Sequence, residues 1–223
     1  DTIREVKRLT GRMVAINLEP ATIKNNDEES VWNLTAGRQA TIDNARKAAD
    51  MGVDMIVLTG NPGVGVDNEA IMQALSKLKD AVGDRVILTA GKMHASGIIS
   101  EAGEKILTEK DVTDFVDAGA DVILLPAPGT VPGITMEYAG KLIKKAHEKG
   151  ALAMTTIGTS QEGADEDTIR QIALMCKMAG ADIHHIGDSG YMGMALPENI
   201  TAYSVAIRGK RHTYRRMAMS LLR

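Results

Sequence analysis

The sequence predicts a parallel α/β barrel, because one phrase occurs three times along the chain. The copies lie at 49–58, 117–125 and 178–186, and each has a glycine, an Asp two residues later and then a short apolar run. The glycine closes a helical pattern, where a left-handed backbone is common. The apolar run is typical of a buried parallel strand. A repeated helix–strand–loop unit of this kind predicts a barrel whose chemistry lies on the loops after the strands.

Length and composition agree with one large α/β domain. The chain has 223 residues, of which 44% are hydrophobic and 25% are charged, as in ordinary globular domains. The net charge of −3 gives no general attraction to nucleic acid or to an anionic membrane. No apolar run approaches the roughly 20 residues that span a bilayer. Cys176 is the only cysteine, so we expect a buried, inert thiol in a reducing, cytoplasmic setting. We also expect a homo-oligomer with no nucleic-acid or membrane partner.

Helical and strand patterns alternate along the chain. Strands are expected near 13–19, 53–59, 86–90, 121–125, 151–157 and 182–186. Helices are expected near 1–10, 37–51, 67–81, 108–118, 135–149 and 165–179, followed by a last helix that starts near Pro197 and breaks near Gly209.

Six strands are two fewer than a closed barrel of this type has. The chain begins at Asp1 on a helix with no strand before it, so we expect that a β-α-β segment is missing ahead of it. Residues 1–223 would then form a single domain that holds the third to eighth units of a (β/α)8 barrel. An open, doubly wound sheet is the alternative. Such folds more often have a glycine-rich turn after the first strand, and none follows 13–19.

Two glycine-rich loops are candidates for binding a small phosphorylated metabolite. They follow the strands at 151–157 and 182–186, the last two of the expected barrel, where many barrels hold phosphate on backbone N–H groups. The candidate residues are Gly158, Thr159, Ser160, Gly187, Asp188, Ser189 and Gly190. Asp188 would repel an anion unless it faces away or holds a sugar hydroxyl or a metal. Alternatively, the glycines only turn the chain and the hydroxyls cap the next helix.

Lys92 and His94 are candidate catalytic residues after the strand at 86–90. They are two residues apart, so they share a face if the extended backbone continues. A lysine in a barrel mouth can form a Schiff base or clamp an anion, and a histidine beside it can move protons near neutral pH. A solvated lysine and a histidine bonded to backbone are the alternative.

Other polar residues follow the strands at 13–19 and 53–59. Glu19 could be a general base or a metal ligand, and Asn17 shares its face as a candidate substrate contact. A strand-end acid that only caps a neighbouring loop is the alternative. Asn61 is a turn residue first and a candidate substrate contact second.

A metal site is a weaker hypothesis. His184 and His185 are adjacent in a strand, so only one can face the barrel interior, where it could join Glu19 and His94 around a divalent metal. No spacing such as H-E-x-x-H supports this site. We therefore assign no metal ligands and no certain cofactor, and the alternative is a hydrogen-bonded core histidine.

Basic residues gather in the last helix. They are Arg208, Lys210, Arg211, His212, Arg215 and Arg216. We expect them to offset the helix dipole and to solvate the outer face, with an oligomer contact or an anion site as the alternative. Aromatic residues make up only 3% of the chain and no recognised module occurs, so nucleic-acid binding is not expected.

Four segments carry a resemblance to a known family. The runs at 33–41, 60–63, 90–94 and 206–214 resemble an uncharacterised bacterial (β/α)8-barrel family. Its members are often labelled "haloacid dehalogenase-like hydrolase" and accompany sugar phosphotransferase operons. The resemblance implies a barrel, about two further strands ahead of Asp1 and a sugar-phosphate context. It implies no catalytic residues.

Three functional classes follow from these residues. The leading one is a lyase, aldolase or isomerase that acts on a small phosphorylated sugar or keto acid. The second is a hydrolase with a divalent metal on Glu19, His94 or Asp188, and the third is a non-catalytic phosphosugar-binding regulator. The haloacid dehalogenase motif Asp-x-Asp has its letters at 165–167, but these residues open a helix and follow no buried strand.

Overall fold

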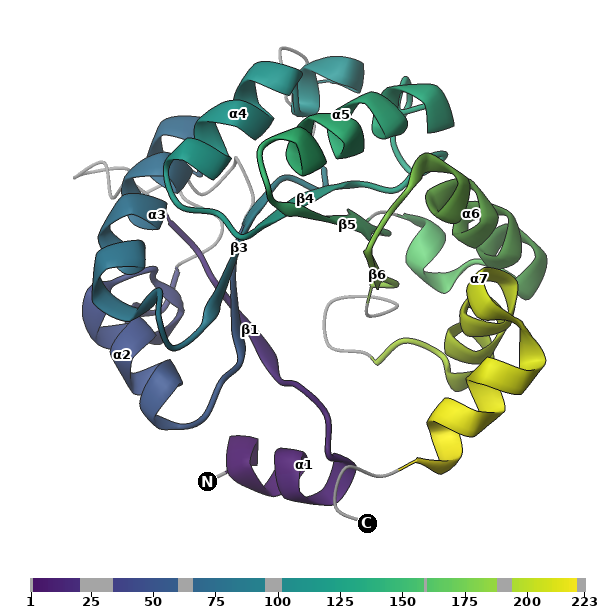
Figure 1. Cartoon of the computed structure of the whole chain (residues 1–223), viewed down its shortest axis with the longest axis horizontal. Coiled ribbons are helices and arrows are strands. Elements are labelled where there is room, and N and C mark those ends of the chain that lie inside the picture. The colour runs from purple at the N-terminus through teal and green to yellow at the C-terminus, as the bar shows by residue number, and fades with distance from the viewer. Residues whose placement is uncertain are drawn as a thin grey trace.

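Six parallel strands curl into an open sheet that carries its helices on the outer side (Figure 1). The structure is a computed structural model that describes residues 2–20, 34–59, 66–94, 102–158, 160–187 and 194–219. The strands are β1 (Ala15–Leu18), β2 (Met55–Leu58), β3 (Ile87–Gly91), β4 (Val122–Pro126), β5 (Leu152–Thr156) and β6 (Ile183–His185). Their order in the sheet is the order in the sequence, and all neighbours are parallel. The parallel α/β prediction is confirmed, whereas a doubly wound sheet would reverse its strand order.

The helices lie where the sequence predicts, and polar side chains cap their first turns. The α-helices are α1 (Thr2–Thr10), α2 (Ile42–Asp50), α3 (Asn68–Val82), α4 (Glu109–Asp117), α5 (Met136–Glu148), α6 (Glu166–Ala179) and α7 (Pro197–Ala218), and the short 3₁₀ helices are η1 (Ala36–Arg38), η4 (Gly103–Ile106) and η5 (Ser160–Gly163). The N-caps that accept a backbone N–H three residues on are Thr41, Asp67, Thr108, Thr135 and Asp165. Helix α2 begins later than residue 37, because Thr41 provides its cap and η1 takes up the residues before it.

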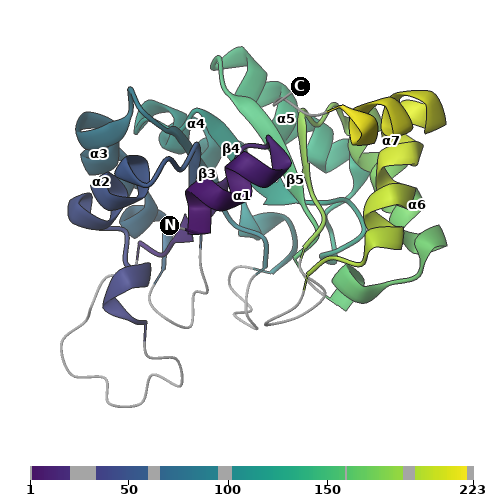
Figure 2. The ribbon, with the colours of Figure 1, turned by 90° about the horizontal axis from the view of Figure 1, so that it is seen from below.

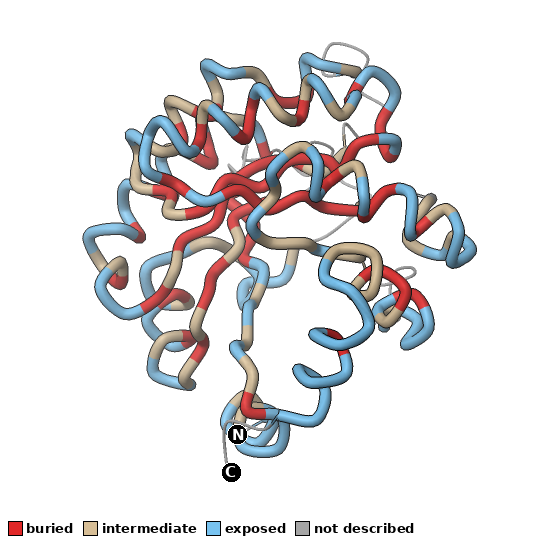
Figure 3. The backbone as a smooth tube through the Cα atoms, turned by 45° about the vertical axis from the view of Figure 1, so that its right-hand side comes forward, coloured by how far each residue is buried: buried red, intermediate tan, exposed pale blue. Residues whose placement is uncertain are grey.

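Apolar side chains pack on both faces of the sheet. The larger cluster lies between strands and helices and includes Ile56, Leu88 and Ile123. A smaller cluster that includes Leu124 and Met154 fills the inner face. Figure 3 shows the inner strands β2 to β5 as the most continuously buried part of the chain, whereas the edge strands β1 and β6 are less buried. Because burying each such side chain contributes about 1.5–3 kcal/mol, these clusters hold the strand ends in fixed positions.

The repeated phrase builds the same contact three times, and we call each instance an Asp clamp. Asp54, just before β2, accepts the backbone N–H of Val14 at 2.8 Å and pairs with Lys7 of α1 at 2.8 Å. In the second clamp, Asp121 accepts the N–H of Leu88 at 2.9 Å and pairs with Lys79 at 2.8 Å. In the third, Asp182 accepts the N–H of Ala153 at 2.8 Å and contacts His147 at 2.7 Å. Each clamp joins a strand pair, β1–β2, β3–β4 or β5–β6, to the helix that precedes the first strand of that pair. The domain is therefore built of two-strand units.

The two edge strands do not pair with each other. Among the described strands, β1 and β6 are the ends of the sheet. The segment before β1 instead reaches the end of α7, where the Arg12 guanidinium donates from Nη2 to the carbonyls of Arg216 at 2.8 Å and Met219 at 3.2 Å. That two further strands complete the barrel stays a prediction.

Helix α7 is long and bent. It spans 22 residues and is interrupted at Gly209, whose φ of 76° and ψ of 163° are not helical. The predicted break near this glycine is confirmed. In the part of the chain that the structure describes, no helix has both the length and the apolar character needed to cross a membrane.

Candidate active site at the carboxyl ends of the strands

Parallel strands bring their carboxyl ends to one edge of the sheet, and the predicted site residues that the structure describes lie at or near this edge. Glu19 follows β1, Lys92 and His94 follow β3, Gly158 follows β5 and Gly187 follows β6. In barrels of this type the chemistry takes place at this edge.

Lys92 is buried directly after β3. Only 3% of the residue is exposed, which is rare for a lysine and costly unless its charge is matched or lost. The residue before it, Gly91, lies so close to the backbone of Leu124 that any Cβ would overlap the Leu124 carbonyl. A buried lysine at a strand end is a strong candidate for a functional group.

His94 is half-buried two residues further on. Burial lowers the pKa of its imidazole below the usual 6.5, because a charged ring is poorly solvated there. The ring is therefore neutral at pH 7 and can accept a proton.

Met93, between these two residues, contacts the loop after β5. A Cβ at Gly158 would lie 2.6 Å from the Met93 Sδ and 2.8 Å from its Cβ, which leaves no room for a side chain. Met93 also packs on the inner-face apolar cluster. The predicted catalytic segment and the first predicted phosphate loop are therefore in direct contact.

The two predicted phosphate loops also contact each other. Gly187, after β6, has a φ of 80°, and a Cβ there would lie 2.5 Å from Cγ of Glu162 in η5 and 2.7 Å from the Ile157 carbonyl oxygen. Thr159, Asp188, Ser189, Gly190 and Asn61 lie outside the described residues, as does the side chain of Ser160. Their part in an anion site stays a prediction.

Glu19 is held by a residue that we did not predict. Its carboxylate accepts a hydrogen bond from the guanidinium of Arg38 in η1, and only 7% of Glu19 is exposed. The side chain of Arg38 is 55% exposed, so it adds a cation to this edge of the sheet. Asn17 is exposed on β1, while its neighbours Ile16 and Leu18 pack into the outer core.

The structure separates the two adjacent histidines. His184 faces the helices: its Nδ1 lies 3.0 Å from the Tyr203 hydroxyl oxygen of α7, and the two rings meet edge to face. Burial, and then the charge of Arg208, lowers the pKa of His184. The core-histidine alternative is thus correct for His184.

His185 lies on the inner face, in register with Thr156 of β5. Its Nδ1 accepts the N–H of Gly187 at 3.1 Å, so the neutral ring carries its proton on Nε2. Sequence alone could not distinguish the two histidines, because strand alternation does not reveal which residue points inward.

Three buried threonines near these strands were also missed. Thr59, Thr89 and Thr156 are at most 3% exposed, and their hydroxyl oxygens have no hydrogen-bond partner among the described residues. A buried hydroxyl without a partner is unfavourable, so such atoms can mark places where a ligand or a water binds.

In the described part of the chain, no cluster of metal-binding side chains supports the metal hypothesis. Within it, no group of three or more His, Cys, Asp or Glu side chains is arranged to hold a metal ion. Asp188, which belonged to that hypothesis, lies outside the described residues, so a divalent metal stays an untested prediction.

Proteins similar in sequence include enzymes named for a sugar phosphate. The chain is 36% identical over 89 residues to a Haemophilus influenzae protein named "Putative N-acetylmannosamine-6-phosphate 2-epimerase". It is 35% identical over 88 residues to the protein of that name from Actinobacillus pleuropneumoniae. Both matches take in 40% of this chain and 33% of the relative, so the similarity spans a third of those proteins.

Two solved structures share the fold. The tetrameric deoxyribose phosphate aldolase of Aeropyrum pernix superimposes with a TM-score of 0.55 at 15% identity, over 93% of this chain and 79% of the aldolase. The structure titled "putative deoxyribose-phosphate aldolase" from Coccidioides immitis gives 0.56 at 13% identity, over 87% and 66%. At such low identity these likenesses concern the fold alone, and they match the curled parallel sheet to aldolase barrels.

These comparisons correct one expectation and establish the family. The label "haloacid dehalogenase-like hydrolase" is wrong for this chain, because its relatives are named as epimerases and its structural neighbours are aldolases. The model of the family described as "Domain of unknown function (DUF7916)" matches residues 1–223. The chain therefore belongs to the DUF7916 family.

Proposed function

We propose that this chain carries the active site of an isomerase or lyase that acts on a small phosphorylated sugar or keto acid. The contact between Met93 and Gly158 carries the proposal, because Met93 directly follows the buried Lys92 in the chain and Gly158 begins a glycine-rich loop. Relatives named as sugar-phosphate epimerases and a fold shared with aldolase barrels support the same class.

In this proposal the loops after β5 and β6 bind the phosphate. Gly158 and Gly187 let these loops pack closely against Met93 and Glu162. The Gly187 N–H already donates to His185, so we expect the phosphate on the remaining N–H groups of the loops. Arg38, in η1 beside the edge strand β1, would bind a negatively charged group or a hydroxyl of the substrate. The threonine hydroxyls that have no partner among the described residues would bind the sugar hydroxyls.

Lys92 and His94 would act on the carbonyl end of the substrate. Epimerisation at carbon 2, isomerisation and aldol cleavage all break a bond to the carbon beside a carbonyl and move the electron pair towards the carbonyl oxygen. Lys92 would stabilise that charge, either as an ammonium bonded to the oxygen or as an imine formed with loss of water. Neutral His94 would take the proton from the adjacent carbon, with Glu19 as the second candidate base.

Calorimetric titration with N-acetylmannosamine 6-phosphate tests the phosphate loops. In the Gly187→Ala variant, the new methyl group meets Glu162 and the Ile157 carbonyl, so we expect affinity to fall about tenfold or more. Gly150→Ala is the matched control, because Gly150 has a φ of 84° and open space around it. Each substitution costs roughly 1–2 kcal/mol of stability from the left-handed backbone. Equal affinities in the two variants would show that the phosphate binds elsewhere.

A further inference from the structure

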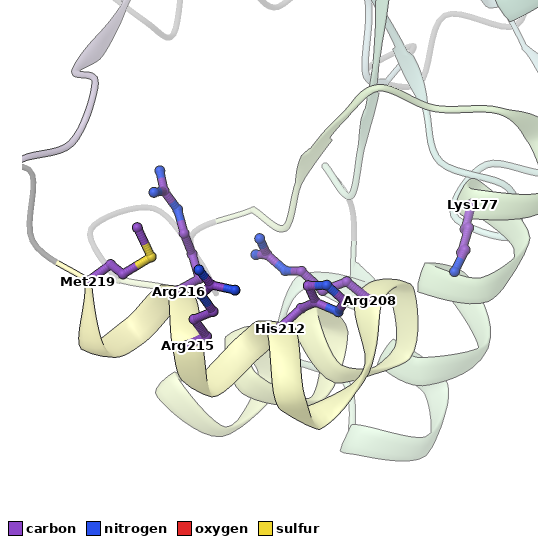
Figure 4. Close-up of a pocket in the computed structure, with 6 residues that line it drawn as sticks. All are labelled: Lys177, Arg208, His212, Arg215, Arg216 and Met219. Atoms are coloured by element: carbon purple, nitrogen blue, oxygen red, sulfur yellow. The ribbon is translucent and has the colours of Figure 1, made fainter.

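A second charged hollow lies far from the strand ends, between α6 and α7. Its volume is about 640 Å³, and the residues that line it are Lys177, Arg208, His212, Arg215, Arg216 and Met219. Figure 4 shows Arg208 and Arg216 extending from the same side of α7, with Lys177 on α6 across from Arg208. No carboxylate is among the lining residues, so the hollow is strongly cationic.

The hollow lies at the opposite end of the domain from the candidate active site. Lys177 is in the last turn of α6, which leads to the amino end of β6, and Arg215 and Arg216 are in the last turn of α7. Figure 2 shows the end of α7 at the edge of the domain away from η1, which follows the carboxyl end of β1. A ligand bound here would not touch Lys92 or His94.

The sequence builds the hollow through the bend at Gly209. The bend frees the Ile207 carbonyl, and Lys177 Nζ donates to it at 2.6 Å, which ties α7 to α6. After the bend, His212, Arg215, Arg216 and Met219 recur at helical spacing and share one face.

Helix-end electrostatics alone does not account for these cations. At the end of α7, the carbonyls of Arg216 and Met219 already accept hydrogen bonds from Arg12. No carboxylate of the described residues pairs with Arg208, Arg215 or Arg216, and the one hydrogen bond of these three side chains within that part of the chain joins Arg208 to Ser204. Like charges that lie together without a counter-charge repel one another, so an anion bound here would relieve that repulsion.

We propose that this hollow binds a small molecule with two or more phosphate groups, such as a nucleoside diphosphate or triphosphate. Arginine guanidinium groups bind phosphate oxygens two at a time, and several cations favour a ligand with several negative charges. The volume is that of a small-molecule site, and Met219 offers an apolar contact for the rest of the ligand. A ligand at this distance from the strand ends would regulate the protein and would not react.

Titration with tripolyphosphate and with ATP at constant ionic strength tests the proposal. We expect saturable binding, and a loss of roughly tenfold to 100-fold in the double variant Arg208→Gln, Arg216→Gln. The matched control is Lys210→Gln, Arg211→Gln, which removes the same charge from α7 outside the lining of the hollow. That control should stay within about twofold of the parent, and circular dichroism confirms that both doubles are folded.

Three outcomes would overturn the proposal. One is the absence of saturable binding by the parent. Another is an equal loss in both double variants, which would show a general charge effect. The third is tighter binding of a single-stranded RNA 20-mer than of tripolyphosphate with equal losses in both doubles, which would indicate a nucleic-acid surface. Lys92→Met should leave tripolyphosphate affinity unchanged, so a failure of the proposed active site is distinguishable from a failure here.

Discussion

The side chain of Met93 lies against the backbone of Gly158, and this contact joins the carboxyl ends of β3 and β5 across β4. Met93 lies between Lys92 and His94 in the sequence. Its contact with Gly158 is therefore the point where the candidate catalytic segment packs on the candidate phosphate loop. The contact exists because Gly158 has no side chain.

Gly158→Ala should therefore disturb both stability and ligand binding. Its new methyl group would overlap Met93, and overpacking of this kind costs typically 1–3 kcal/mol. Chemical denaturation should show a lower midpoint, and calorimetry should show weaker binding of the sugar phosphate.

Adding Met93→Ala should rescue part of this loss. It removes the Met93 Sδ and Cγ atoms from the contact but leaves its Cβ, which would still be 2.8 Å from the new methyl group. A double-mutant cycle measures the coupling between the two positions. Strict additivity would show that the Met93–Gly158 contact does not connect these strand ends.

The Asp clamps should make stability depend on acid pH. Although burial raises their pKa values, the hydrogen bonds from Lys7 and Val14 hold the carboxyl of Asp54 below its usual pKa, and those from His147 and Ala153 do the same for Asp182. A folded-state pKa below the unfolded one gives stability that is present above about pH 4 and is lost as pH falls through the folded value. Asp54→Asn and Asp182→Asn should each lower the midpoint of urea unfolding at pH 7. Near pH 3 the midpoints of variant and parent should lie closer together. A constant difference at both pH values would contradict this account.

Much of the fold could be predicted because local signals and packing agree. The glycine, the Asp and the apolar run of the repeated phrase mark a helix end, a clamp and a strand, and all three copies adopt that structure. The start of α2 was placed too early, since Thr41 is an N-cap whose effect outweighs the helical pattern before it.

The site was less predictable, because it depends on contacts between distant segments. Strand ends pointed to Lys92 and His94, but their burial follows from packing that no local pattern encodes. The pairing of Glu19 with Arg38 and the choice between His184 and His185 likewise depend on which side of a strand faces the helices. An exposed arginine two residues after the start of a short 3₁₀ helix carries no distinctive sequence signal.

His94 should set the acid limb of activity. Burial lowers its pKa, so the neutral base persists below pH 6.5, and kcat/KM should fall only at lower pH. Because the folded pKa lies below the unfolded one, stability should be complete above about pH 6.5 and should fall as pH decreases from there. His94→Gln should remove the acid limb and reduce the change in melting temperature between pH 7 and pH 5. Lys141→Met, at an exposed lysine on α5, is the control and should leave both profiles unchanged.

Borohydride separates the two roles proposed for Lys92. If the lysine forms an imine, reduction in the presence of the sugar phosphate should attach the sugar covalently to Lys92, which mass spectrometry of peptides can locate. If Lys92 acts as an ammonium, no adduct should form, and Lys92→Arg should keep much of the binding. An adduct on a different lysine would contradict both roles.

The most direct test of the proposed active site is the exchange of the substrate proton beside the carbonyl, followed by NMR in D₂O with the same sugar phosphate. The account predicts exchange catalysed by the parent and by Lys141→Met, an exposed lysine on α5. It predicts a loss of about 1,000-fold or more in Lys92→Met. Exchange that survives in Lys92→Met, or sugar phosphate that binds the parent without any exchange, would contradict it.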